Sequence, residues 1–152
     1  MRMERVASRL RELGRDTWDA STTAVVVVGA DDEDLARQLR ALVSPEVRVR
    51  ALSVRATIDG LPPFTVAVFA GMPTSAADPE QELARMAQPF LRLGSGATAV
   101  LPADNEAAGL LAEIVPPHAR VLRVGATEGK TALLRATLDA LATVLASNAR
   151  VP

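Results

Sequence analysis

The side chains of this sequence whose number and spacing are most suggestive of a chemical site are acidic. Asp31 and Asp32 begin an unbroken acidic run that extends to Asp34, shortly after a run of valines that is followed by Gly29. Carboxylate oxygens are the ligands that hard divalent cations prefer. The same run also suits the first turn of a helix, where acidic side chains cap backbone N–H groups and complement the helix dipole. We expect this second role, with solvated charges, and predict neither a metal site nor another cofactor.

The segment from Gly125 to Gly129, followed by Lys130, is the second place where chemistry could occur. A helix that starts after a glycine-rich turn can receive an anion on its backbone N–H groups. A tight strand-to-helix turn also needs glycine without any ligand, and this is the interpretation we favour. His118 is the single histidine and the chain has no cysteine, so thiol catalysis, zinc–cysteine sites and Cys/His dyads are excluded. We expect His118 on the surface and predict no catalytic residue.

Composition narrows the class of protein. The chain has 152 residues, of which 49% are hydrophobic and 23% charged, and its net charge is -1. These values are typical of one soluble domain with a substantial core. A near-zero net charge argues against a nucleic-acid partner, because such binding depends on a surplus of Lys and Arg. No apolar stretch reaches the roughly 18 residues of a membrane span, and the first residues lack a signal-peptide core, so we expect a cytoplasmic protein without membrane contact.

The hydrophobic pattern predicts one α/β domain over 1–152. Residues 1–20 form an N-terminal helical extension, amphipathic over 3–13, and the body spans 23–146. Strands are expected at 24–28, 47–51, 64–70, 97–101 and 120–124, with a helix after each strand except the second. Strands that alternate with helices favour right-handed crossovers. We therefore predict a three-layer, Rossmann-like sandwich with a mostly parallel five-stranded sheet and helices on both faces.

For two of these strands and one helix, the sequence also predicts the position in the sheet, the pairing and the helix ends. Residues 47–51 alternate apolar side chains with arginines, which places that strand toward a sheet edge. The short link over 55–63 suits a hairpin-like pair with the strand that starts at Phe64. Asp78 is expected as the N-cap of the helix that begins at Pro79, and Pro89 is expected to end or kink that helix.

Ligands of open α/β sheets bind beyond the carboxyl ends of the strands. In this sequence four loops follow such ends, within 29–34, 70–75, 101–105 and 125–130. A groove between these loops would be the site for a ligand or partner. Its candidate residues are Gly29, Asp31, Asp32, Asp104, Thr127, Gly129 and Lys130.

The end of the chain resembles small P-loop GTPases of the Ras/Era type. Residues 123–129 read Arg-Val-Gly-Ala-Thr-Glu-Gly and precede a leucine-rich segment, similar to that family's last strand, Ser-Ala-x-x-Gly guanine-contact loop and final helix. Asp104 falls where the family has its base-reading aspartate, although Leu101 and Pro102 replace the preceding Asn and Lys. The phosphate-binding pattern Gly-x-x-x-x-Gly-Lys-Ser/Thr is replaced by Gly-Ala-Asp-Asp-Glu-Asp-Leu-Ala over 29–36. Because these carboxylates would repel a triphosphate, the resemblance implies a pseudo-GTPase.

The front of the chain resembles response-regulator receiver domains, over about 24–146. A valine run followed by Asp31 and Asp32 is similar to the receiver's first strand and acidic pair. The phosphoryl-accepting aspartate is missing, because the third strand ends in Phe-Ala-Gly over 69–71. The fourth and fifth strands are followed by Pro-Ala and Gly-Ala instead of the family's Ser/Thr and Lys. This resemblance implies a pseudo-receiver that is not phosphorylated.

Three functions remain open on the sequence. We favour a non-catalytic regulatory or interaction module derived from a G domain, with a protein partner or a second copy as its ligand. The alternative is an atypical receiver-like signalling domain, which requires five parallel strands in the order 2-1-3-4-5. The third is a weak nucleotide-binding protein with a phosphate site over 127–130.

Overall fold

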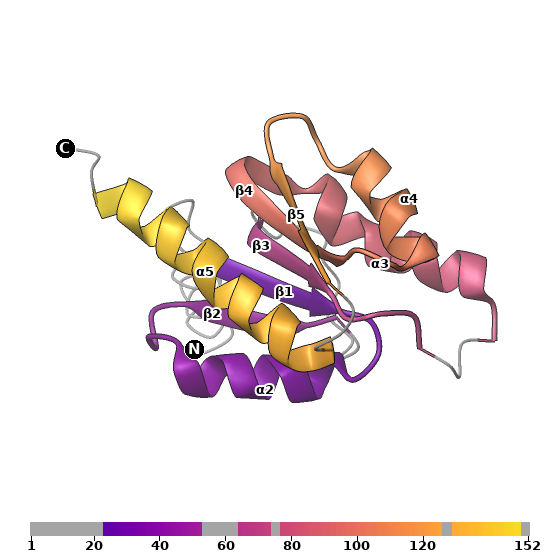
Figure 1. The fold of residues 1–152 in the computed structure, drawn as a ribbon, viewed down its shortest axis with the longest axis horizontal. Coiled ribbons are helices and arrows are strands. Elements are labelled where there is room, and N and C mark those ends of the chain that lie inside the picture. The colour runs from indigo at the N-terminus through magenta and orange to yellow at the C-terminus, as the bar shows by residue number, and fades with distance from the viewer. Residues whose placement is uncertain (1–22, 53–63, 74–76, 126–128, 150–152) are drawn as a thin grey trace, which may run out of the picture.

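The computed structural model describes residues 23–52, 64–73, 77–125 and 129–149, and the helix expected over 3–13 lies outside them. Within these residues strands and helices alternate as predicted (Figure 1). The elements are β1 (Ala24–Val28), α2 (Asp32–Leu42), β2 (Arg48–Ala51), β3 (Phe64–Phe69), α3 (Pro79–Leu91), β4 (Leu93–Pro102), α4 (Glu106–Ile114), β5 (Arg120–Val124) and α5 (Gly129–Ala149).

The five strands form one sheet in the order β2-β1-β3-β4-β5, and every pairing is parallel. The expected hairpin between the second and third strands is wrong. β2 pairs with β1, from Ala24 opposite Arg48 to Val27 opposite Ala51, and lies on the other side of β1 from β3. The valines of β1 are buried on both faces, which requires a central position. The alternating exposure of β2 fits the edge, as predicted from its sequence.

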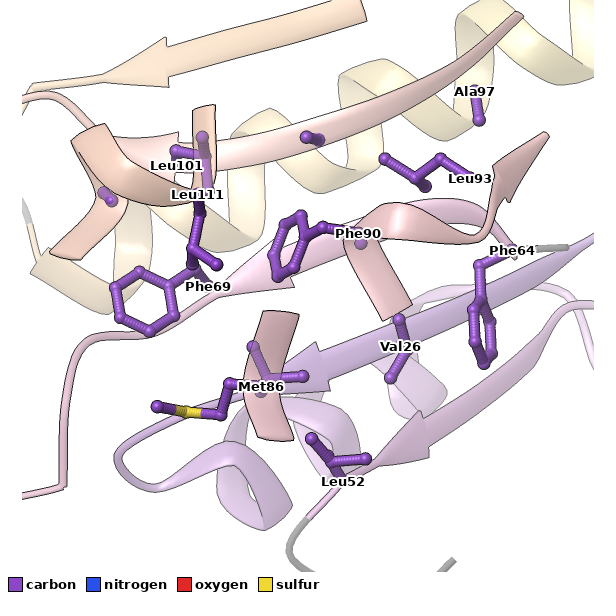
Figure 2. Packing of buried hydrophobic residues seen from close by; sticks show 14 of the residues in the cluster. Val26, Leu52, Phe64, Phe69, Met86, Phe90, Leu93, Ala97, Leu101 and Leu111 are labelled. Atoms are coloured by element: carbon purple, nitrogen blue, oxygen red, sulfur yellow. The ribbon is translucent and has the colours of Figure 1, made fainter. Parts of the chain in front are cut away.

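Helices cover both faces of the sheet and create two separate cores. Helices α2 and α5 pack on one face, and α3 and α4 pack on the other (Figure 1). Because successive strand residues point to opposite faces, Val25 and Val27 enter the α2–α5 core, whereas Val26 enters the α3–α4 core. Figure 2 shows the second core, where Phe90 of α3 and Phe69 of β3 are among the fully buried side chains.

Strand β3 contains an irregularity that changes which face one of its residues occupies. The register between β3 and β4 shifts between Phe64 and Val66. Val66 belongs to the α2–α5 core, whereas Phe64 belongs to the α3–α4 core; regular alternation would place both on one face. The intervening Thr65 accepts a hydrogen bond from the backbone N–H of Ala24 at 3.2 Å through its Oγ1. The shift thus brings a large aromatic ring into the α3–α4 core.

The start of α3 confirms the sequence prediction, but its end differs. The Asp78 side chain accepts a hydrogen bond from the Gln81 N–H at 3.2 Å, and Pro79 is the first helical residue. The helix does not stop at Pro89 and continues to Leu91. Leu93 then begins β4, so that this strand includes the Gly-Ser-Gly segment over 94–96 and starts earlier than residue 97.

Helix α4 also has a side-chain cap, and this cap can be tested. The Asn105 Oδ1 accepts from the Ala108 N–H at 3.0 Å. We expect Asn105→Ala to lower the free energy of unfolding by about 1 kcal/mol, because an N–H group in the first turn loses its partner. Urea titration monitored by circular dichroism measures the change. Asp104→Ala, at the exposed neighbouring position, is the matched control and should change stability by less than about 0.5 kcal/mol. Equal effects of the two substitutions would contradict the capping role.

No helix in the described part of the chain combines the length and the apolar character that crossing a bilayer requires.

Candidate functional site

The carboxyl ends of all five strands lie at one edge of the sheet, because every pairing is parallel. The order β2-β1-β3-β4-β5 runs in opposite directions from β1, so the switch point lies between the ends of β1 and β3. In sheets of this kind ligands bind in the crevice at the switch point. The residues to examine first are therefore those that follow Val28 and Phe69.

Backbone groups of these two loops are in direct contact. The Ala30 N–H donates to the Gly71 carbonyl O at 2.8 Å. Gly29 has φ +109°, and a Cβ atom on it would lie 2.2 Å from the Gly71 carbonyl O. Only glycine can therefore occupy position 29 without a shift of the backbone. Main-chain atoms of Gly29, Ala30 and Gly71 thus pack against one another at the switch point.

The acidic run begins α2 as expected, but its first residue does not cap the helix. Asp31 is the N-cap with φ 54° and ψ 32°, and its side chain makes no capping hydrogen bond. A capping side chain normally requires extended backbone at this position, so the left-handed conformation explains why the capping prediction fails for Asp31. Asp32 is only 3% exposed, which also contradicts the expectation that this charge is solvated.

Lys130 in the first turn of α5 is the cation that meets this acidic turn. Its Nζ lies 3.2 Å from Oδ2 of Asp31 and 3.2 Å from Oδ2 of Asp34. Arg37 and Gln38 also donate to the Asp34 carboxylate. The Lys130 ammonium and the Arg37 guanidinium hold the pKa of Asp34 below its usual value, and Asp31 and Asp34 raise the pKa of Lys130. The edge is thus a mixed-charge cluster and not a purely acidic one.

The ion pair between Lys130 and Asp34 can be tested by measuring the pKa of Asp34. We expect Lys130→Met to raise the pKa of Asp34 toward its ordinary value of 3.8, because the largest cause of its lowering is removed. Lys130→Arg keeps the charge and should keep this pKa low. Carboxyl-carbon NMR titration measures both variants. An unchanged pKa in Lys130→Met would show that the ion pair does not form in solution.

The lowered pKa of Asp34 and the raised pKa of Lys130 determine how the stability of the folded state depends on pH. A lowered carboxyl pKa stabilises the folded state above the unfolded-state pKa. The contribution of Asp34 is therefore present above 3.8 and is lost as the pH falls below that value. The raised pKa of Lys130 acts in the opposite direction, so its contribution is present below 10.5 and is lost as the pH rises above it.

Three further residues were predicted for the site, Asp104, Thr127 and Gly129. Asp104 is exposed in the turn after β4, and no ion pair joins it to another described residue. Gly129 is the first residue of α5, whereas Thr127 lies outside the described residues. His118 is exposed as expected, and its Nε2 lies 2.8 Å from the Leu93 carbonyl O. Of the predicted site residues, the structure thus brings Asp31 and Lys130 into contact.

Two features of the site were not predicted from the sequence. The first is the contact of Gly71 with the loop of Gly29, and the second is the pairing of Asp34 with Lys130. Lys130 is the single lysine and follows the last strand, which is the signal that could have placed it at this edge. In the described residues no group of three or more His, Cys, Asp or Glu side chains could hold a metal ion.

The architecture is a Rossmann-like α/β sandwich with a five-stranded parallel sheet. The sequence matches no model of a known protein family, and no curated protein is significantly similar to it.

Proposed function

We propose that the chain is a non-catalytic interaction module of the receiver-like kind, which works without a phosphoryl group or a nucleotide at the carboxyl edge of its sheet. The strand order supports this alternative over the G-domain one. Five parallel strands in the order 2-1-3-4-5 are what the receiver resemblance requires, whereas the G-domain interpretation relied on a hairpin of β2 with β3.

The observation that carries the proposal is the backbone contact at the switch point. In the receiver resemblance the end of β3 bears the phosphoryl acceptor, and here that position leads into Gly71, whose carbonyl accepts from Ala30. This hydrogen bond uses the Ala30 N–H, a backbone donor of the loop that follows β1. That donor is therefore not available to a phosphate, which needs free backbone N–H groups in such a loop.

The charge on Lys130 supports the same conclusion. A lysine in the first turn of a helix could attract a phosphate. This ammonium already lies between two carboxylates, Asp31 and Asp34. A phosphate would have to compete with both carboxylates and would be repelled by them. This disfavours the alternative of a weak nucleotide site over 127–130.

Strand β5 supplies a surface for a protein contact. All its residues are exposed or half-exposed, and Val121 and Leu122 are 41% and 38% exposed on opposite faces. The carbonyl O of His118 accepts a hydrogen bond from the N–H of Gly96 in β4, and the carbonyl O of Val124 accepts one from the N–H of Ala103, just after β4. Alternation along the strand therefore directs the backbone groups of Val121 and Arg123 outward. An exposed edge with apolar side chains is suited to pairing with another strand, and we propose β5 of a second copy as the partner.

The nucleotide part of the proposal is tested by amide NMR. We expect the signals of residues 29–34, 71 and 129–130 to stay unchanged when GTP, GDP or ATP is added with Mg²⁺. Incubation with acetyl phosphate should leave the intact mass unchanged. Micromolar binding that moves these signals, or a covalent phosphoryl adduct, would overturn the proposal.

Self-association is tested by sedimentation velocity over a range of concentrations. We expect the wild-type chain to form a dimer and Leu122→Glu to remain monomeric, because a charge at the centre of β5 would be buried against the partner. Leu42→Glu is the matched control, since Leu42 is an exposed leucine, 58% exposed, at the end of α2. A monomeric wild type, or a Leu122→Glu variant that still dimerises, would contradict pairing through β5.

A further inference from the structure

The two edges of the sheet differ in how their outward backbone groups are used. At β2 the N–H of Arg48 donates to the residue before β1, so alternation directs the backbone groups of Val49 outward. The outward carbonyl O of Val49 accepts hydrogen bonds from Nε and Nη2 of Arg40 at 3.2 and 3.0 Å. At β5, by contrast, no hydrogen bond from the described residues reaches the outward backbone groups of Val121 and Arg123. The open edge of the sheet is therefore β5.

Strand β5 also carries exposed apolar side chains on both of its faces. Helix α5 packs mainly on β3 and β4, and α4 packs on β4 and α3, so β5 lies at the margin of both helical layers. The register with β4 places Val121 beside Ala99 of the α3–α4 core and Leu122 beside Val100 of the α2–α5 core. These two side chains thus extend the two cores to the edge, one on each face, and a partner strand would cover both.

The symmetry of a dimer restricts how two copies of β5 can pair. A two-fold axis perpendicular to the sheet makes the strands antiparallel and places one residue opposite itself. An axis between two residues would oppose outward-directed and inward-directed backbone groups, so the axis must pass through a residue. β5 is five residues long, Arg120–Val124, and Leu122 is its centre. An axis at Leu122 pairs every residue of the strand, whereas an axis at Val121 or Arg123 leaves two residues of each copy unpaired.

We propose that two copies of β5 pair antiparallel about Leu122, so that the two sheets form one continuous sheet with both α2–α5 layers on the same face. This inference rests on the proposed function and specifies the residues that meet in its dimer. The backbone groups of Leu122 are directed toward β4, so it meets the partner's Leu122 as a non-hydrogen-bonded pair, in which the strands approach most closely. The hydrogen bonds between the copies join Val121 of one to Arg123 of the other.

The arginines of β5 favour the same register. Like charges directly opposite each other destabilise a strand pair. In the proposed register Arg120 lies opposite the partner's Val124, and Arg123 lies opposite the partner's Val121, so no two arginines are directly opposed. An axis at Arg123 would oppose two guanidinium groups. Nη2 of Arg123 also donates to the Ala103 carbonyl O at 3.2 Å, which holds this charge on its own subunit.

The register is tested by cross-linking single-cysteine variants of the full chain, which contains no native cysteine. We expect Leu122→Cys to form a disulfide-linked dimer when diamide is added, because the Cα atoms of a non-hydrogen-bonded pair lie about 4.5 Å apart, within the range of a disulfide. Val121→Cys is the matched control and should not link to itself, because its two copies would be about 8–9 Å apart. Leu42→Cys, at an exposed leucine of α2, measures random collision. Leu122→Cys should give about tenfold more linked dimer than Leu42→Cys, since pairing raises the effective concentration of the thiols.

A mixture of two variants provides a second measurement that leaves Leu122 intact. Val121→Cys and Arg123→Cys should link to each other when mixed, because these positions form a hydrogen-bonded pair with Cα atoms about 5.5 Å apart. Neither variant should link to itself. Intact mass under non-reducing conditions identifies the mixed dimer, and thermal melts establish that each variant is folded.

Two results would overturn the register and leave pairing through β5 in place. One is that Val121→Cys links to itself and Leu122→Cys does not, which would put the axis at Val121. The other is that the chain dimerises but Leu122→Cys links no more than Leu42→Cys, with no mixed dimer of Val121→Cys and Arg123→Cys. A wild-type chain that stays monomeric in sedimentation velocity would overturn the proposed function and the register with it, so the two failures are distinguishable.

Discussion

Gly29→Ala should lower the free energy of unfolding by about 4 kcal/mol, which combines backbone strain with overpacking. Gly29 has φ +109°, a conformation that L side chains rarely adopt, and the new methyl group would lie 2.2 Å from the Gly71 carbonyl O. Neither atom belongs to a flexible side chain, so the two loops must separate. The hydrogen bond from Ala30 to Gly71 would be weakened by the same movement.

Two other glycines separate the causes of this effect. Gly71 has φ +105°, but a Cβ on it would meet none of the described residues within 4 Å, so Gly71→Ala is expected to report the backbone strain, about 1–3 kcal/mol. Gly109 lies in α4, and a Cβ there also meets nothing within 4 Å. Gly109→Ala should therefore stabilise the protein by about 0.5–1 kcal/mol. Urea unfolding of the three variants measures the series, and a Gly29→Ala loss no larger than that of Gly71→Ala would refute the clash.

Phe69→Ala should cost about 4 kcal/mol, the usual range for removing a buried aromatic ring. Phe69 is 0% exposed at the end of β3 and belongs to the core between the sheet and helices α3 and α4 (Figure 2). Leu101 and Leu111 belong to the same core. The substitution would leave a cavity that the rigid strand cannot close. The loss is a large part of the about 5–15 kcal/mol that stabilises an ordinary domain.

The measurement is again urea unfolding, with Leu122→Ala as the comparison. Leu122 also lies on a strand, but it is 38% exposed, so its truncation should cost less than about 1 kcal/mol in the monomer. The comparison is made at a concentration where the chain is monomeric. Similar losses for the two variants would mean that Phe69 does not pack as the structure describes.

The layers of this fold were predictable because burial dictates them. The valine run of β1 requires cover on both faces, and the alternating arginines of β2 require an edge; both expectations are confirmed. The partner of β2 was not predictable in the same way. The alternation of apolar residues and arginines suits an edge strand whether it pairs with β1 or with β3. The link over 55–63 was interpreted as a hairpin only because it is short. Local sequence thus determined what β2 buries but not with which strand it pairs.

The site was less predictable than the fold, because its contacts join distant segments. Lys130 and Asp34 are 96 positions apart, and nothing in either local pattern indicates the other. Asp31 illustrates a second limit. Its residue type favours capping, but the path from β1 into α2 gives it a positive φ, and this geometry takes precedence over the preference of the residue type.

The hydrogen bonds that Arg40 donates to the Val49 carbonyl O affect how copies of this chain could polymerise. A sheet with two open borders can add molecules at both, without end, as fibres do. Here the outward carbonyl of Val49 is already occupied by a guanidinium, which leaves β5 as the border suited to further strands. When two molecules pair through β5, neither has this edge strand free for a third molecule. Assembly would then stop at the dimer, and the hydrogen bonds of Arg40 would prevent fibre growth from the β2 edge.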